Sequence, residues 1–251
     1  MAVDPIPGEP AALADTGRER ALLVADYHAG IEAGLRREGV ELPGDGTDRR
    51  ERLVDLVARE SPDRLVVVGD LGDAIGDPGR EERAELADLF AALPADLPVT
   101  VTKGNHDGDL PDALDGVAQS VEVTPGHGVR LGSLGVAHGH VWPSRAVLEA
   151  EVVCVAHEHP VVRLEDAVGG HRVERVWLRG ELVPDPFEAF HDSELDAAEE
   201  LVVVPAFNDL SGGTWVNVES QDFLSPFLPE GLANGQAYML DGTRLGEYRR
   251  V

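Results

Sequence analysis

The sequence predicts an α/β fold built on a largely parallel sheet, and two observations carry that prediction. Up to Lys103, apolar runs alternate with stretches of helical periodicity in the order β-α-β-α-β, the pattern of parallel strands joined by right-handed crossovers. In addition, five apolar runs end directly in Asp, His or Asn side chains. Because ligands of such sheets bind beyond the carboxyl ends of the strands, these five ends predict one shared site.

The alternating elements of the first half follow from local patterns. Uncharged apolar runs predict buried strands, and Leu53, Leu56 and Val57, at i, i+3 and i+4 spacing, predict a helix. The predicted elements are, in order, a strand at residues 21–25, helices at 29–38 and around 53–57, a strand at 65–68, a helix at 82–93 and a strand at 97–102.

The second half contains shorter apolar runs split by Gly, Pro or acidic turns, and these predict a meander. The runs cover residues 121–123, 128–131, 134–137, 152–156, 160–164 and 172–178, with a short helix at 144–150. Further expected elements are a short helix within 184–200, a strand at 201–204 and a hairpin of 237–240 with 244–248. Residues 1–251 are expected to form one domain, with 1–19 as a loose N-terminal lead-in and the strands of 201–251 completing it.

The chain is strongly acidic, with a formal net charge of −26 at pH 7 and Lys103 as its single lysine. The carboxylates are spread along the sequence, which is typical of proteins from salt-loving organisms; an acidic enzyme from ordinary conditions is the alternative. No basic stripe is present. A nucleic-acid partner is therefore allowed but unsupported by the charge.

One cysteine, Cys154, lies within an apolar run and is interpreted as a core residue, and no internal disulfide can form. No apolar run approaches the ~20 residues that span a membrane, and the N-terminus lacks the features of a signal peptide. We therefore expect a cytoplasmic protein without a membrane partner. Its oligomeric state is open, with a homodimer as one option.

The polar strand ends supply a mixed set of oxygen and nitrogen donors. Asp26 and His28 stand two residues apart beyond a strand, so in extended geometry both side chains point to one side. Asp70 is a carboxylate able to bridge two cations. The seven candidate metal ligands are Asp26, His28, Asp70, Asn105, His138, His157 and His159.

This donor set has no thiolate and is too rich in nitrogen for Ca²⁺ or Mg²⁺ alone, whereas it suits Mn²⁺, Fe or Zn²⁺. Seven ligands are too many for one tetrahedral ion and fit two ions that share a carboxylate. Two cations about 3.5–4 Å apart can clamp a phosphoryl group and generate a hydroxide nucleophile at neutral pH. The donors therefore predict phosphoester chemistry.

In chain order, the motifs Asp-x-His, Gly-Asp, Gly-Asn-His-Asp, His-Gly and His-x-His resemble those of the calcineurin-like metallophosphoesterase superfamily. The resemblance runs from Asp26 to His159 and implies a four-layer sandwich, in which two mixed β-sheets pack together between flanking helices. It implies one ion held by Asp26, His28, Asp70 and His159, and another held by Asp70, Asn105, His138 and His157.

The resemblance also implies the catalytic groups and the cofactors. His106 would protonate the leaving oxygen or stabilise the charge of the transition state, and Asp73 would orient His106. The implied cofactors are two divalent metal ions, with Mn²⁺ favoured and Fe, Zn²⁺ or Ni²⁺ as alternatives.

A narrower resemblance lies in the tail. Residues 205–208, Gly212-Gly213, Val216-Asn217 and a terminal Asp-Gly-Thr-x-Leu-Gly are similar to archaeal phosphoesterases related to the SbcD-type repair nuclease. The segment after Asp73 lacks the arginine of phosphoprotein phosphatases, which argues against that branch. Ala156 stands where the superfamily usually has Gly, and no long insertion that could form a DNA-binding cap is present.

The expected function is that of a dinuclear metal-dependent phosphodiesterase, which hydrolyses a nucleotide or nucleic-acid ester by attack of a metal-bridging hydroxide. One alternative is a phosphomonoesterase with a small phosphate ester as substrate. The other is a non-catalytic metal-binding interaction module of the same fold. The complete ligand set favours an enzyme.

Neighbouring polar residues receive structural interpretations. Asp107 is expected to fix its turn by accepting hydrogen bonds from local backbone amides, and Glu158 is expected to be solvated. His140 either supports a ligand or faces the substrate. Asn208 is considered as a loop anchor near the site.

Overall fold

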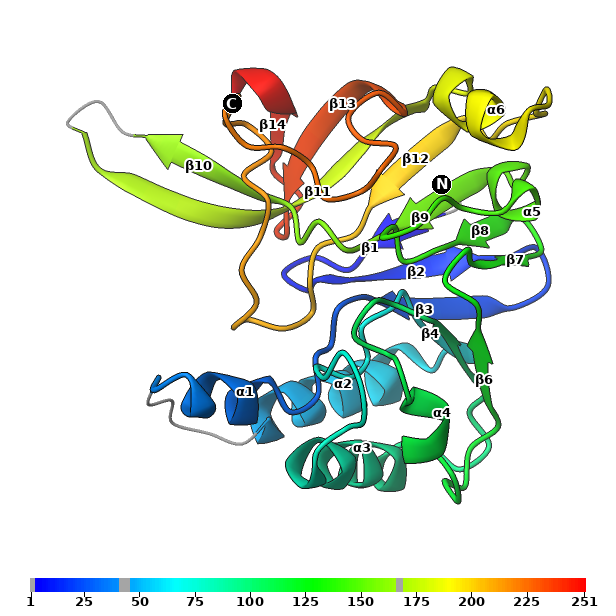
Figure 1. Cartoon of the computed structure of the whole chain (residues 1–251), viewed down its shortest axis with the longest axis vertical. Helices are drawn as coiled ribbons and strands as arrows, with labels where there is room; N and C mark the ends of the chain where they lie inside the picture. The colour runs from blue at the N-terminus through cyan, green and yellow to red at the C-terminus, as the bar shows by residue number, and fades with distance from the viewer. Residues whose placement is uncertain (1–2, 41–45, 166–168) are drawn as a thin grey trace.

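Two β-sheets pack face to face in the computed structural model, and helices lie on the outer side of each sheet (Figure 1). The structure describes residues 3–40, 46–165 and 169–251. Both sheets are mixed, because each contains parallel and antiparallel pairs. This arrangement confirms the α/β class and the four-layer sandwich that the resemblance implied.

The first sheet has six strands within the described residues, in the order β1-β2-β3-β4-β5-β6, and β3 to β6 are parallel. Helices α1 to α4 lie on its outer side (Figure 1). The strands are β1 (Val3–Pro5), β2 (Ala11–Asp15), β3 (Arg20–Val24), β4 (Arg64–Val67), β5 (Val99–Thr102) and β6 (Val121–Thr124). The helices are α1 (Ile31–Arg37), α2 (Thr47–Glu60), α3 (Arg80–Ala92) and α4 (Leu110–Ala113).

The expectation of a loose lead-in was wrong for the described residues 3–15. β1 and β2 form a hairpin, and β2 pairs antiparallel with β3 from Ala11 to Asp15. Ala11, Ala12 and Ala14 are completely buried. Alanine has a low intrinsic preference for strands, so pairing with β3 and burial between layers decide the conformation here.

The second sheet has the strand order β14-β13-β11-β12-β9-β8-β7 within the described residues, and β10 pairs with β11 beyond this path. Its strands are β7 (Val129–Leu131), β8 (Leu134–Val136), β9 (Val152–Val155), β10 (Val161–Glu165), β11 (His171–Leu182), β12 (Glu200–Val203), β13 (Leu232–Met239) and β14 (Arg244–Glu247). The helical elements beside it are α5 (Arg145–Leu148), α6 (Asp185–His191) and the 3₁₀ turn η1 (Tyr248–Arg250).

The predicted meander was therefore only partly correct. β6, which was expected in the meander, pairs with β5 in the first sheet. β8, β9 and β12 are parallel to one another. α5 provides the connection that parallel β8 and β9 require, since a hairpin turn joins only antiparallel strands. The antiparallel pairs of β10 with β11 and of β13 with β14 do follow the prediction.

Alternating residues of the central strands pack into different layers, as the two-residue period of a strand requires. In β3, Leu22 and Val24 face the helices, whereas Leu23 faces the core between the sheets. Cys154 and Trp177 lie in this inter-sheet core and are fully buried. No helix in the described ranges is long and apolar enough to cross a membrane.

Candidate metal centre

The loops that follow β3, β4 and β5 meet the loops that follow β8 and β9. The candidate site is thus formed by strand ends of both sheets. The expectation from the sequence was a site at the edge of a single sheet. The inter-sheet core lies directly beneath, with Ala25, Val68 and Ala156 among its buried residues. Packing of the two sheets therefore brings together residues from Asp26 to His159.

The first candidate ligand group consists of Asp26, His28 and His159. One donor atom from each residue lies within 4.8 Å of the others. His159 Nε2 is 3.3 Å from Asp26 Oδ1, and the other ring nitrogen, Nδ1, is 2.7 Å from the carbonyl oxygen of Gly212. This second contact fixes the orientation of the imidazole, as carbonyl partners of ligating histidines commonly do.

The second group consists of Asp70, His138 and His157, whose donor atoms also lie within 4.8 Å of one another. His138 Nε2 is 3.3 Å from Asp70 Oδ2 and 3.2 Å from Asn105 Oδ1. Asp70 Oδ2 is also 3.9 Å from His28 Nε2 in the first group. Asp70 therefore lies between the groups, where one carboxylate can serve two cations.

Asp26 shows why the site fits a cation. Its side chain is completely buried, yet neither carboxylate oxygen has a hydrogen-bond partner among the described residues. Its neighbours are imidazole nitrogens, His159 Nε2 at 3.3 Å and His138 Nδ1 at 3.7 Å, and a buried carboxylate is costly unless such groups or a metal ion balance its charge. With imidazole nitrogens and further carboxylate oxygens around it, the site has donors that suit first-row divalent metals.

Left-handed backbone conformations mark the same residues. The φ angle is positive at Asp26, His28, Asp70, His157 and His159, with values from 44° to 70°. Each such conformation costs about 1–3 kcal/mol and persists where the surrounding structure imposes it. The strain is concentrated on candidate ligands, as is common at functional sites.

Two glycines allow the loops to approach closely enough. A Cβ atom on Gly104 would lie 2.0 Å from Asp70 Oδ1, and one on Gly69 would lie 2.1 Å from His138 Nδ1. No side chain fits at these distances. The Gly-Asp and Gly-Asn motifs therefore have a steric reason as well as a chemical one.

Burial and neighbouring charges shift the pKa values of this cluster in opposite directions. Burial alone would lower the pKa of His138, but the carboxylates of Asp70 and Asp26 raise it to about 9. Burial works against ionisation of Asp70, and the charge of His138 nevertheless lowers the pKa of Asp70. His157 has its pKa lowered to about 4 by burial and by His138, so it is a neutral donor at pH 7.

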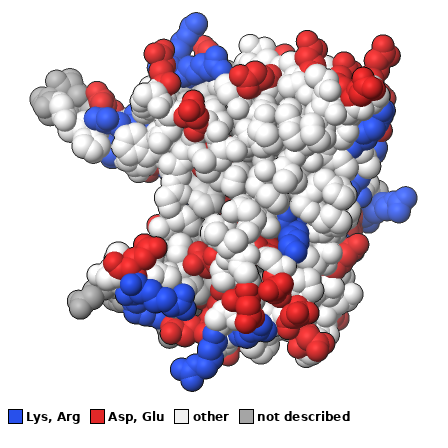
Figure 2. Space-filling view, viewed as in Figure 1, with Lys and Arg blue, Asp and Glu red and all other residues white. Residues whose placement is uncertain are grey.

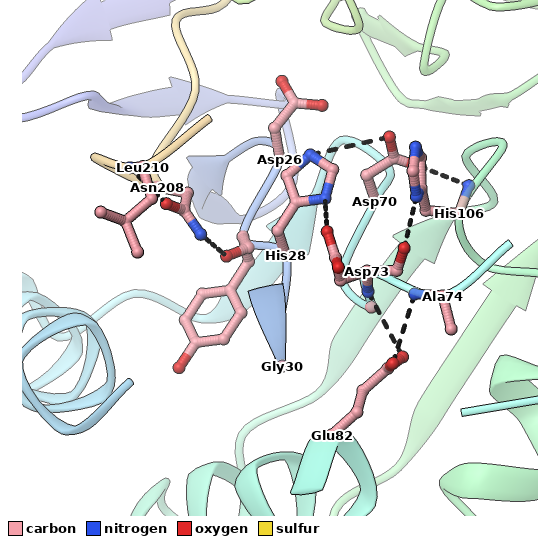
Figure 3. A network of polar contacts seen from close by, with 12 residues as sticks. Asp26, His28, Gly30, Asp70, Asp73, Ala74, Glu82, His106, Asn208 and Leu210 are labelled. Atoms are coloured by element: carbon pink, nitrogen blue, oxygen red, sulfur yellow. Dashed lines mark hydrogen bonds and ion pairs between the residues drawn. The ribbon is translucent and has the colours of Figure 1, made fainter. Parts of the chain in front are cut away.

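His106 lies beside the candidate ligands and lines a cavity of about 370 Å³. Its backbone N–H donates to Asp70 Oδ1 at 2.9 Å, and its Nδ1 is hydrogen-bonded to the main-chain carbonyl of Asp73 (Figure 3). The Asp73 carboxylate lies 3.2 Å from His28 Nδ1. Asp73 thus contacts His106 through its peptide carbonyl, while its side chain contacts a candidate ligand.

The profile of the calcineurin-like phosphoesterase family matches residues 19–216 of the chain. The chain belongs to this family. It is accordingly a metal-dependent phosphoric ester hydrolase.

One solved structure supports the fold of this phosphoesterase. The crystal structure of the Pseudomonas putida nuclease MPE is 22% identical, covers 95% of this chain and 97% of its own, and has a TM-score of 0.58. The E. coli phosphoesterase YfcE is 18% identical and covers 59% and 74%, with a TM-score of 0.34. No curated protein sequence gives a significant match.

One neighbouring residue of the phosphoesterase was misjudged from the sequence. Glu158, expected to be solvated, is completely buried between two candidate ligands. Its carboxylate accepts hydrogen bonds from Thr214 Oγ1 at 2.8 Å, Leu224 N at 3.0 Å and Ser225 N at 2.7 Å. The only local signal in the sequence is its position between the two candidate ligands His157 and His159.

Other expectations for the surroundings agree with the structure. Asp107 accepts hydrogen bonds from the backbone N–H groups of Gly104 at 2.8 Å and Gly72 at 3.0 Å. Asn208 is buried and donates to the carbonyl oxygen of Tyr27 at 3.0 Å, so it anchors a loop beside Asp26 and His28. His140 packs against His138, with ring centroids 5.3 Å apart, and lies outside both ligand groups.

Proposed function

We propose that this phosphoesterase hydrolyses a phosphodiester of a nucleotide or nucleic acid at a dinuclear metal centre. The observation that carries the dinuclear assignment is the position of Asp70 between the two candidate ligand groups. Asp26, His28, Asp70 and His159 would hold one ion, and Asp70, Asn105, His138 and His157 the other. Bound divalent cations would supply Lewis acidity toward the phosphoryl oxygens and lower the pKa of an attacking water.

His106 is proposed as the residue that donates a proton to the leaving oxygen or stabilises its charge. It lines the cavity, and the Asp73 carbonyl bonded to Nδ1 leaves Nε2 as the nitrogen available for a substrate. A carbonyl acceptor at Nδ1 requires a proton on that atom. With a second proton on Nε2, His106 would act as a general acid.

The cavity lining favours a diester over a monoester. Its described lining residues include no Lys or Arg, and they include the carboxylate of Asp222. A monoester at neutral pH carries up to two negative charges on the phosphoryl group, because its second pKa is about 6. A diester carries one. The smaller charge needs less cationic support beyond the metal ions.

Three narrower assignments belong to the same proposal. Mn²⁺ is the proposed metal, because mixed carboxylate, amide and imidazole donors suit it. Operation in concentrated salt is supported by the net charge of −26. Membership of the archaeal SbcD-related branch is supported by the tail motifs at residues 205–217 and near the C-terminus.

The test is Mn²⁺-dependent hydrolysis of bis(p-nitrophenyl) phosphate, compared with the p-nitrophenyl monoester, in molar KCl. His106→Ala should lower kcat by about 10²–10⁴, the usual range for a lost general acid or base, for a thymidine dinucleotide, whose alkoxide leaving group needs a proton. The loss on bis(p-nitrophenyl) phosphate should be smaller, and metal binding should be retained. A variant as active as the wild type would refute the role of His106. Preference for the monoester would refute the diester assignment, and a metal-loaded protein inert toward both would favour the interaction module.

A further inference from the structure

Glu82 is a buried carboxylate outside the two ligand groups, yet it reaches the loop that carries Asp73. It lies in the first turn of α3 and is 5% exposed. Glu82 Oε1 accepts a hydrogen bond from Asp73 N at 3.3 Å, and Glu82 Oε2 accepts one from Ala74 N at 3.2 Å (Figure 3). Both oxygens are thus directed at the backbone that supports His106.

The surrounding chain leaves space for this carboxylate. A Cβ atom on Gly72 would lie 2.4 Å from Glu82 Oε1, and a Cβ atom on Gly30 would lie 2.7 Å from Glu82 Cβ. Gly30 and Gly72 belong to the loops after β3 and β4, whose backbones pair through a bridge between Ala29 and Gly72. A side chain at either glycine would displace Glu82.

A single peptide unit connects Glu82 to His106. In a planar trans peptide, the C=O of one residue and the N–H of the next point in opposite directions. The N–H of Ala74 donates to Glu82, and the C=O of Asp73, in the same unit, is bonded to His106 Nδ1 (Figure 3). Glu82 therefore fixes the plane of the group that orients the imidazole.

We propose that Glu82 is a positioning residue for His106 and acts through the Asp73–Ala74 peptide unit. The kinetic part rests on the proposed function, in which His106 assists departure of the leaving oxygen. Hydrogen bonds in such a chain strengthen one another, so a carboxylate at the N–H end makes the carbonyl a better acceptor for His106 Nδ1–H. The imidazole is then held in one orientation, with Nε2 toward the cavity.

The test compares Glu82→Ala and Glu82→Gln with Glu81→Gln. Glu81 is the neighbouring residue on α3, but its side chain is exposed and pairs with Arg36. Two diesters are used: bis(p-nitrophenyl) phosphate, whose leaving group needs little protonation, and a thymidine dinucleotide, whose alkoxide leaving group needs it. Each kcat and KM is measured alongside the number of bound Mn²⁺ ions.

For Glu82→Ala we expect kcat for the dinucleotide to fall at least tenfold more than kcat for the aryl diester. KM and bound Mn²⁺ should be nearly unchanged. For Glu82→Gln, kcat for the dinucleotide should fall less, because the amide oxygen still accepts a hydrogen bond from one N–H group. For Glu81→Gln, kcat should equal that of the wild type. If kcat of Glu82→Ala fell equally for both substrates, Glu82 would only anchor the loop, and the proposal would be overturned.

A second readout does not depend on turnover. In protein labelled with ¹⁵N-histidine and loaded with Zn²⁺, the ring nitrogens of His106 should report a protonated Nδ1 in the wild type and in Glu81→Gln. Both Glu82 variants should weaken this signature. If the wild type cleaves neither ester, the proposed function fails, while the ring spectrum still decides whether Glu82 orients His106. An unchanged spectrum in folded Glu82→Gln would overturn the inference.

Discussion

At the residue scale, the candidate site combines charges that oppose one another with backbone conformations that are costly alone. His138 is protonated more easily than a free histidine because Asp70 and Asp26 face it. His157, which follows the neighbouring strand β9, is protonated less easily because it is buried near His138. Such divergent pKa values within one cluster are characteristic of functional sites.

Glu82 gives a pH-dependent prediction at this scale. Burial is the main cause that raises its pKa to about 7, from an ordinary value of 4.5. Since the folded state then binds the proton more tightly, its contribution to stability is fully present below about pH 4.5 and is lost as the pH rises through 7. Between pH 5 and 8, the free energy of unfolding should fall more in the wild type than in Glu82→Gln. Parallel urea-denaturation curves for the two proteins across this range would contradict the prediction.

At the element scale, short loops at the ends of strands carry the chemistry, and a distant segment closes one side of the cavity. Residues 212–214, 221, 222 and 224 line the cavity that contains His106. Glu158 fixes this segment at two places, Thr214 and the backbone of Leu224 and Ser225. The ligand loop after β9 and the cavity wall are therefore joined by one buried carboxylate.

Glu158→Ala should destabilise the protein and loosen this wall. Its loss leaves buried donors without an acceptor, at about 1–3 kcal/mol for each unsatisfied group. KM for the diester should rise. Thr214→Val, which removes one of the hydrogen bonds, is the matched variant and should cost about 1 kcal/mol. Denaturation and steady-state kinetics measure both effects, and similar losses for the two variants would show that Glu158 does not anchor the wall.

How much of this arrangement the sequence predicts depends on how far apart in the sequence the interacting residues lie. Asp26, Asp70 and His138 stand at the ends of local apolar runs, so their strands and their clustering were predictable. The hairpin of β1 and β2 was not, because its alanine-rich strand is stabilised by pairing with β3. The hydrogen bonds of Glu158 span 56 to 67 residues in sequence, and no local pattern records such pairs.

At the scale of the whole molecule, acidic charge dominates. Figure 2 shows Asp and Glu along the upper edge and over the lower part of the visible face, with Lys and Arg in smaller groups among them. The formal net charge of −26 produces mutual repulsion that destabilises the compact state at low ionic strength. The two sheets and their helices are therefore held together against a repulsion that salt can weaken.

The midpoint of thermal unfolding should accordingly rise with KCl. The increase should be clear between about 0.1 M, where the Debye length is ~10 Å, and about 1 M, where it is ~3 Å. Sorbitol at the same osmolality, which does not screen charge, is the control. A midpoint that falls with KCl, or that rises equally with sorbitol, would show that charge repulsion is not the dominant effect.

Equilibrium binding of Mn²⁺ tests most directly the claim that Asp70 is shared by two ions. We expect two Mn²⁺ per chain in the wild type, measured by dialysis and elemental analysis. Asp26→Asn should lower the affinity for one Mn²⁺ ion, because Asp26 belongs to one ligand group. Asp70→Asn should lower the affinity for both ions. One ion per chain in the wild type, or two ions of unchanged affinity in Asp70→Asn, would contradict the dinuclear centre.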